Sequence, residues 1–400
     1  MDKKHTREQV RAQISAPVLY RVFNIAFAVV FFAVVVLAVF MNPNVAYYYL
    51  WYGLLGALAA GAVVAFGASR LFMLIKKTPK KGTEIAVVAG LMVLLGLVQA
   101  YFIWGLLPQP AALDDFGAVY TSAADYALGG GLPGDYFLVN PTHTGTYTLL
   151  AGFFSLLAQF GVTDFALPSA ILNALAIDGA VLMLYFCGRR LWSSRRAIFL
   201  LAVAAGSVPL LLYTPVAYSY TLALPFVTGI LLLWLKARAA WRGGSLRGAV
   251  VRFCVLSALA GAGALLKATV LVIWLAVVLD LLLLLSGKGR LRLLLAGLGC
   301  TALIFVGGTI GLRHTPLMPA YDQNDGFPLR GFVLMGLDGD GGYSAEDLEL
   351  VMAQEGSRAR ATFINAEIAQ RLGDLGFGGV MEHLGYKIGY TFGDGTGGAA

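Results

Sequence analysis

The sequence predicts an all-α polytopic membrane protein with about nine transmembrane helices, and three observations predict it. Of its 400 residues, 58% are hydrophobic and only 13% are charged, whereas soluble domains are roughly 45–50% apolar and about 25% charged. Several apolar runs exceed the ~18 residues expected of a helix that crosses a bilayer. Basic residues gather in short segments between these runs. This pattern excludes a soluble enzyme, a disordered chain, a coiled coil and a disulfide-rich secreted scaffold.

The expected spans follow the apolar runs in chain order. They are residues 17–41, 46–69, 85–107, 166–187, 197–214, 220–236, 249–266, 269–287 and 292–312. We divide the chain into an N-terminal segment with a two-span hairpin, a transmembrane core and an external C-terminal region, at 1–84, 85–312 and 313–400. A long external loop, 108–165, interrupts the core and is expected to carry interfacial helices.

The charge distribution orients these spans. The net charge is +7, and 22 of the 29 basic residues lie in five short segments beside apolar runs. Cytoplasmic loops of membrane proteins are enriched in Lys and Arg in this way, so we expect a cell-membrane protein with a cytoplasmic N-terminus and an external C-terminal region. Because the basic residues flank spans and do not form a continuous surface, we expect no nucleic-acid partner.

Residues 143–160 are a candidate tenth span. If they crossed the membrane, the basic segment 188–196 would lie outside, against the charge rule. The run is also short and contains Gly145 and Gly152, so we favour a helix that lies in the outer interface.

The region after Arg313 differs in kind from the core. It is rich in Gly, Asp and Glu, and apolar residues recur at helical spacing over about 344–372. We expect amphipathic helices there. No closing span precedes the end of the chain, which is the pattern expected of a truncated protein.

The external loop carries the first candidate catalytic residues. Asp114 and Asp115 follow a predicted span by about seven residues, so they should lie near the outer membrane surface. A positioned carboxylate can take the proton of a hydroxyl group as that group attacks. The alternative is that the pair caps a helix that starts at Phe116, since Asp is a common N-cap residue.

Three further side chains are candidates for binding a substrate. Lys267 stands between two apolar runs, where it either meets an anion such as a lipid phosphate or snorkels to the headgroups. His143 could hydrogen-bond a sugar or a phosphate, or act as a polar anchor at the interface. Tyr218, with Tyr213 and Tyr220, could line a sugar site or form part of the aromatic belt.

We expect no metal and no cofactor. Asp114, Asp115 and His143 could share a divalent ion, but their spacing matches no ligand signature. The three cysteines, Cys187, Cys254 and Cys300, lie in or beside apolar runs and show neither metal spacing nor a disulfide framework.

The order of these features resembles the GT-C superfamily of multi-pass glycosyltransferases, which includes protein O-mannosyltransferases and the aminoarabinose transferases of lipid A. The resemblance covers about residues 85–395, and each motif is loose; what is specific is their order. The motifs are Leu113-Asp114-Asp115-Phe116, Asp135-Tyr136-Phe137, Asn140-Pro141-Thr142-His143-Thr144-Gly145, Gly161 to Phe165, the basic turn Gly188 to Arg196, and Lys267.

The resemblance implies transfer of a sugar from a polyprenyl-phosphate donor to a cell-envelope glycan, glycolipid or protein, with inversion at the anomeric carbon. It implies that Asp115 is the general base, with Asp114 as the alternative, and that Lys267 holds the donor phosphate. Tyr136 falls in a matched motif and is a further candidate for binding the substrate. The C-terminal region is similar to a subgroup of bacterial cell-envelope enzymes, but Gly331 replaces a His found there in many members.

Two other functions compete with this one. A transporter or flippase of a lipid-linked saccharide would be expected to show repeated halves and charged residues at mid-membrane, and the sequence shows no internal repeat. A sensor or scaffold would not need a long acidic first loop. A glycosyltransferase is therefore the favoured hypothesis, and the transporter is the alternative.

Overall fold

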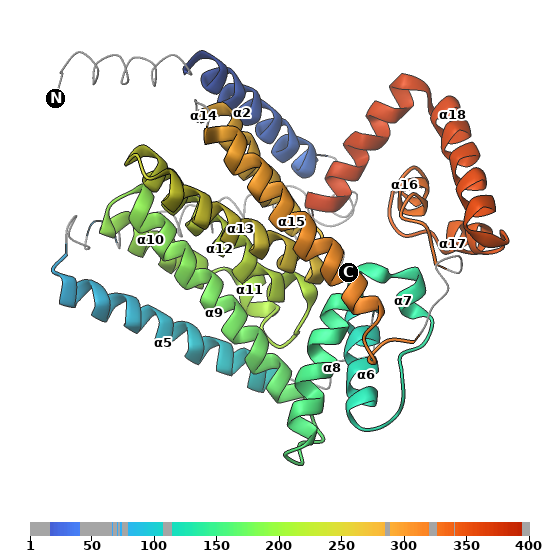
Figure 1. Cartoon of the computed structure of the whole chain (residues 1–400), viewed down its shortest axis with the longest axis horizontal. Helices are drawn as coiled ribbons and strands as arrows, with labels where there is room; N and C mark the ends of the chain where they lie inside the picture. Colours follow the sequence, from blue (N-terminus) through green and yellow to red (C-terminus); the bar gives the residue numbers. More distant parts are fainter. Residues whose placement is uncertain are drawn as a thin grey trace. The chain divides into compact units, whose positions relative to one another are not determined.

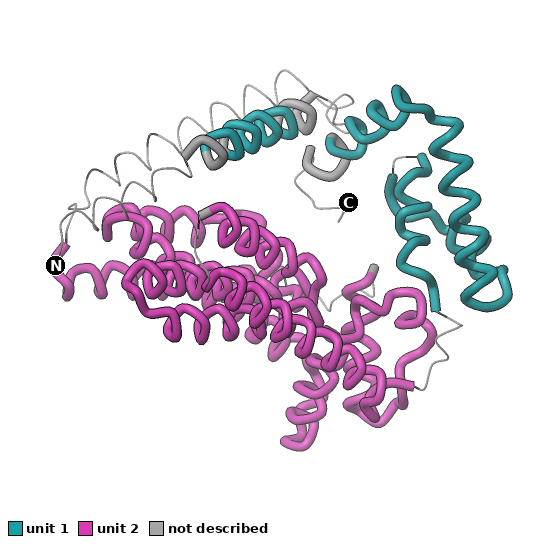
Figure 2. Tube along the Cα trace, turned by 45° about the horizontal axis from the view of Figure 1, so that its top comes forward, with its two compact units in different colours: residues 1–65, 321–400 teal, residues 66–320 magenta. Residues whose placement is uncertain are grey.

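The computed structural model describes residues 17–40, 66, 70, 73, 79–106, 114–284, 289–319, 326–339 and 341–393. Every regular element within these ranges is a helix (Figure 1). The chain forms two compact units, residues 66–320 and residues 1–65 together with 321–400 (Figure 2). The sequence-based division at 1–84, 85–312 and 313–400 stays a prediction.

Five helices are long and apolar enough to cross a membrane. They are α5 (Lys81–Leu106), α9 (Ala166–Leu191), α12 (Ser219–Arg242), α13 (Leu246–Leu266) and α15 (Gly289–Arg313). Two further apolar helices are α2 (Pro17–Phe40) and the shorter α14 (Val270–Leu284). Within its described residues, the structure therefore bears out a helical protein with several potential spans. The expected span 46–69 lies outside the described residues except for Phe66, and the number nine stays a prediction.

One expected span is wrong as a continuous helix. Residues 197–214 form two short helices, α10 (Ser194–Ala205) and α11 (Val208–Leu212). Gly206 ends the first, and Pro209 lies in the first turn of the second. A proline has no N–H to donate to the preceding turn, so it starts a helix more readily than it continues one.

The larger unit is a bundle built around α12 and α13. Helix α12 packs on α9 and α13, α13 packs on α15, and α5 packs on α9 and α10 (Figure 1). Small residues allow the close approaches. A Cβ at Gly297 of α15 would overlap the Phe253 ring of α13, and one at Gly263 would lie 2.8 Å from Phe226 of α12. Interfaces between membrane helices favour small residues for this reason.

The external loop of the sequence analysis folds into four short elements at one end of this bundle (Figure 1). They are α6 (Asp114–Ala127), α7 (Tyr136–Val139), the 3-10 helix η1 (Pro141–His143) and α8 (Thr144–Ala158). Helix α6 packs on α8. Helix α8 has 15 residues, which is shorter than the ~20 needed to cross a bilayer. This length matches the interfacial helix that we favoured over a tenth span.

The smaller unit contains α2, α16 (Gly331–Met335), α17 (Ala345–Met352) and α18 (Gly356–Gly393). The expected helices over 344–372 are present as α17 and the first part of α18, which kinks at Gly376. Asp347 is buried and accepts hydrogen bonds from both terminal nitrogens of Arg371, at 2.9 and 2.6 Å. A Cβ at Gly331 would overlap the Phe327 ring, so the His of the similar subgroup would not fit here without a shift of that ring.

Candidate functional site

The packing of α6 on α8 positions Asp115. Val119 and Ala123 of α6 are buried, and the Tyr120 ring meets the Phe154 ring of α8 edge-on, with centroids 5.4 Å apart. Asp115 lies in the first turn of α6, at the end of this packed face. A residue on a packed helix is held more rigidly than one on a free loop. Asp114 begins the same helix, but its side chain lies outside the described residues.

Three side chains surround the Asp115 carboxylate. The Tyr136 hydroxyl donates to Oδ1 at 2.5 Å and the Tyr218 hydroxyl donates to Oδ2 at 3.3 Å. His143 Nε2 lies 3.5 Å from Oδ2. The Asp115 side chain nevertheless remains 46% exposed. The carboxylate is therefore oriented by neighbours on one side and open on the other.

The two tyrosines act as hydrogen-bond donors to this carboxylate. Burial raises the pKa of Tyr136, and the hydrogen bond that Tyr136 donates to Asp115 and the charge of Asp115 raise it further. Burial and the charge of Asp115 likewise raise the pKa of Tyr218. Both phenols therefore keep their protons at neutral pH and can donate to an ionised carboxylate.

His143 lies deeper than Asp115. It ends η1, which begins at Pro141, and its backbone N–H donates to the Asn140 carbonyl at 3.1 Å. The residue is 6% exposed, and Nδ1 has no hydrogen-bond partner among the described residues. Burial lowers the pKa of His143, the charge of Lys267 lowers it further, and Asp115 opposes both. The imidazole is therefore neutral at pH 7.

Lys267 approaches the same group from the turn between α13 and α14. Its Nζ lies 3.9 Å from the centroid of the Tyr220 ring and 5.7 Å from that of Tyr218. An ammonium group over aromatic faces is attracted by their quadrupoles, typically by about 0.5–2 kcal/mol. Lys267 is thus held by aromatic rings, an arrangement that leaves its charge without a carboxylate counter-ion in the described part of the chain.

A close contact between α8 and α13 brings the loop to Lys267. A Cβ at Gly145 would overlap the carbonyl of Leu265, so only glycine fits without a shift. The Thr146 hydroxyl donates to the Leu266 carbonyl at 3.2 Å. His143 and Lys267 each lie within two residues of this contact. The contact therefore sets the distance between the loop and the α13–α14 turn.

The structure brings together five side chains that the sequence analysis singled out, from five separate segments of the larger unit. They are Asp115, Tyr136, His143, Tyr218 and Lys267. Tyr220 joins them through Lys267. The backbone carbonyl of Tyr213 accepts a hydrogen bond from Asn173. Phe116 was not singled out as a site residue, but its ring meets that of Tyr218 at 6.5 Å. Its position next to Asp115 was the one available signal.

The described residues contain no group of three His, Cys, Asp or Glu side chains arranged to hold a metal ion. Asp115 and His143 are neighbours, and Asp114, the third member of the set considered above, lies outside this description. The chemistry that the site can perform with the described residues is proton transfer by a carboxylate and binding of an anion by an ammonium group.

The sequence matches, over residues 19–399, a family described as conserved hypothetical integral membrane protein. The chain belongs to this family. No curated protein and no solved structure matches the chain.

As an integral membrane protein, the chain contacts the lipid bilayer. The outward faces of its apolar helices fit that environment. Trp104 of α5 is 83% exposed and Leu303 of α15 is 73% exposed. Large apolar side chains at such exposure would be costly in water and are favourable in lipid.

Proposed function

We propose that this integral membrane protein transfers a sugar from a polyprenyl-phosphate donor to an acceptor in the cell envelope. The single observation that supports this proposal best is the open carboxylate of Asp115. Two tyrosine hydroxyls orient it, and one of these tyrosines, Tyr218, also contacts Lys267. A base beside a cation is the combination that displacement of a phosphate leaving group requires.

In the proposed reaction, the acceptor hydroxyl attacks the anomeric carbon of the donor sugar. Asp115 takes the hydroxyl proton as the new carbon–oxygen bond forms. The bond between the anomeric carbon and the phosphate oxygen breaks, and its electron pair leaves with the polyprenyl phosphate. Lys267 stabilises the charge that develops on that phosphate. A single displacement of this kind inverts the anomeric carbon. Acceptor classes are a glycan, a glycolipid or a protein.

The proposal includes a topology. We place the site on the outer face of the cell membrane, with about nine spans, a cytoplasmic N-terminus and an external C-terminal region. The basic residues support this orientation. Arg189, Arg190 and Lys236 lie toward the ends of α9 and α12 that are distant from Tyr218 and the external loop, and Lys and Arg are enriched on the cytoplasmic side.

The decisive experiment compares purified wild type with Asp115→Asn. Labelled polyprenyl-phosphate sugars are supplied with crude envelope acceptors, and donor consumption and product are measured. Because general base catalysis contributes roughly 10²–10⁴-fold, we expect Asp115→Asn to lower turnover by at least about 100-fold. The matched control is Asp125→Asn, an exposed acid on the same helix, which should keep wild-type turnover.

Full product formation by a folded Asp115→Asn protein would remove Asp115 as the base. If wild type consumed no donor but moved a lipid-linked saccharide across liposomes, the transporter hypothesis would replace this one.

A further inference from the structure

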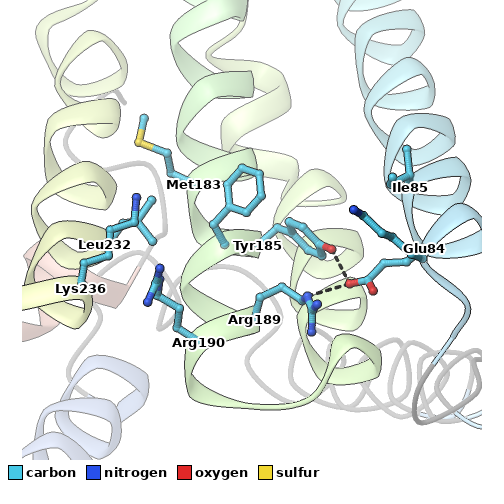
Figure 3. A pocket seen from close by; sticks show the side chains of 10 residues that line it. Glu84, Ile85, Met183, Tyr185, Arg189, Arg190, Leu232 and Lys236 are labelled. Atoms are coloured by element: carbon cyan, nitrogen blue, oxygen red, sulfur yellow. Dashed lines mark hydrogen bonds and ion pairs between the residues drawn. The ribbon is translucent and has the colours of Figure 1, made fainter. Parts of the chain in front are cut away.

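A cavity of about 690 Å³ lies among α5, α9 and α12, away from the Asp115 site (Figure 3). Its lining includes Lys236, which follows Tyr218 by 18 residues along α12. At 1.5 Å per residue, the two positions are about 27 Å apart along the helix. The cavity therefore lies at the opposite end of the bundle, and no step of the proposed reaction uses it.

One ion pair, between Glu84 and Arg189, lines this cavity. Glu84 of α5 accepts a hydrogen bond from the Tyr185 hydroxyl at 2.6 Å, and Arg189 Nε lies 2.7 Å from the same oxygen (Figure 3). Glu84 is 7% exposed. A buried carboxylate needs such partners, so the charges of Glu84 and Arg189 neutralise each other and hold α5 against α9.

The remaining charges of the lining are all positive. Lys81, Arg190 and Lys236 line the same cavity, and none of them has a carboxylate within ion-pair distance in the described ranges. In Figure 3, the Arg190 guanidinium lies on the side of Lys236, away from the Glu84 pair. Three cations that share one cavity without a counter-ion favour an anionic ligand.

The other walls are apolar. Ile85, Met183, Phe186 and Leu232 complete the lining. Ile85 is 59% exposed and Phe186 is 46% exposed. Farther along α5, Val93 is 63% and Leu97 is 64% exposed. A ligand that fits this surface has an anionic group at one end and hydrocarbon at the other.

We propose that this cavity binds the phosphate of an anionic phospholipid headgroup. Arg190, Lys236 and Lys81 contact the phosphate, and the acyl chains extend along the exposed face of α5. Basic pockets between transmembrane helices bind anionic headgroups in this way. A small soluble phosphate compound would satisfy the cations but would leave Ile85 and Phe186 without an apolar neighbour. This inference does not depend on the proposed glycosyl transfer.

The test uses the full-length protein purified in detergent. Binding of phosphatidylglycerol is measured by native mass spectrometry and by the rise in Tm on addition of the lipid. Arg190→Gln/Lys236→Gln is compared with wild type and with Arg242→Gln/Arg247→Gln. Arg242 and Arg247 are exposed cations outside the cavity lining, in the α12–α13 turn region. Since a cation near an anionic headgroup contributes about 1 kcal/mol, we expect the cavity variant to bind about 10- to 30-fold more weakly and the control to bind as wild type does.

Phosphatidylcholine and inorganic pyrophosphate complete the design. We expect neither to stabilise the wild type as phosphatidylglycerol does. Equal binding of both lipids, or equal loss in the control variant, would overturn the site. Stabilisation by pyrophosphate alone would assign the cavity to a soluble phosphate compound and overturn the lipid. If the double variant fails to fold, Lys236→Met serves instead, with a weaker but still selective loss expected, while Arg190→Lys should retain binding.

Discussion

The two ends of the larger unit each hold a carboxylate that accepts a short hydrogen bond from a tyrosine. At one end Tyr185 donates to Glu84 at 2.6 Å, and at the other Tyr136 donates to Asp115 at 2.5 Å. The surroundings differ. Glu84 has Arg189 at 2.7 Å and a side chain that is 10% exposed. The Asp115 side chain is 46% exposed, and its nearest basic neighbour in the described part of the chain is His143, at 3.5 Å.

This comparison shows that the hydrogen bond from tyrosine does not by itself distinguish a reactive carboxylate from a structural one. A carboxylate that is neutralised by a guanidinium and buried cannot accept a proton readily or meet a substrate. Asp115 has neither restriction. The arginine that pairs with Glu84 and the burial of that carboxylate therefore assign it a structural role. Asp115, which has no such partner and is exposed, is available for chemistry.

The largest expected difference between the two ends is the side of the membrane that each faces. Leu132, between α6 and α7, is 49% exposed, and Arg242 is an exposed residue at the end of α12. With an impermeant thiol reagent on intact cells, we expect Leu132→Cys to be labelled and Arg242→Cys to be labelled only after lysis.

Wild type, with its three native cysteines, provides the background for that experiment. Labelling of Arg242→Cys from outside, with none of Leu132→Cys, would reverse the proposed orientation.

The second prediction compares the stability of two variants in which a carboxylate is replaced by an amide. Glu84→Gln leaves Arg189 without its partner, so we expect the free energy of unfolding to fall by about 1–3 kcal/mol, less than for a fully buried pair because Arg189 is half-exposed. Asp115→Asn keeps an oxygen that can accept the hydrogen bond from Tyr136 and leaves no buried charge unpaired, so it should lower the free energy of unfolding by less than Glu84→Gln does. Denaturation of the purified proteins in detergent measures both. Comparable destabilisation by the two variants would contradict the structural and reactive roles assigned above.

The third prediction concerns the two tyrosines that orient Asp115. Tyr136 donates at 2.5 Å and Tyr218 at 3.3 Å. A hydrogen bond to a charged group contributes about 1.5–3 kcal/mol, so we expect Tyr136→Phe to lower kcat by roughly 10- to 100-fold. The longer bond predicts a smaller loss, about 3-fold, for Tyr218→Phe.

Tyr126→Phe, on the same helix as Asp115 but outside its contacts, is the control for donor turnover. If Tyr218→Phe had the larger effect on kcat, the shorter hydrogen bond, from Tyr136, would not be the one that holds the base in position.

The smallest expected effect is the response of stability to acid. Burial lowers the pKa of His143 in the folded protein. In the unfolded chain the same imidazole has the usual pKa of about 6.5, so it takes up a proton at a higher pH than it does in the folded protein. Above that pH the residue contributes nothing to the pH dependence. As the pH falls below it, the folded state loses stability until the lowered pKa is reached. We expect His143→Gln to lack this part of the acid sensitivity, measured as Tm against pH beside wild type. An identical pH profile would argue against a buried neutral imidazole.

Several features of the site could be predicted from the sequence because they depend on the order of apolar runs. Asp115, His143, Tyr218 and Lys267 each stand beside such a run, and the alternation of spans indicates which of them share a side. The contacts could not be predicted in this way. Asp115 and Tyr218 are 103 residues apart in the sequence. No periodic pattern of apolar residues predicts the contact of Gly145 with Leu265.

The prediction failed where hydropathy and backbone chemistry disagree. Residues 197–214 form one apolar run, and Gly206 and Pro209 divide it into two helices. Glu84 was not singled out because its partners, Tyr185 and Arg189, lie more than 100 residues away. The sequence around a single acidic residue at the start of an apolar helix does not indicate which basic residue will pair with it.

By itself, the sequence determined the class of the protein, because apolar runs of bilayer length leave a membrane as the only favourable environment. It also determined which polar residues stand near the ends of those runs. Only the tertiary structure decided how the two carboxylates differ. Their exposure and their distance to an arginine depend on how α5 meets α9 and how α8 meets α13, and these contacts arise from packing of side chains that are distant in the chain.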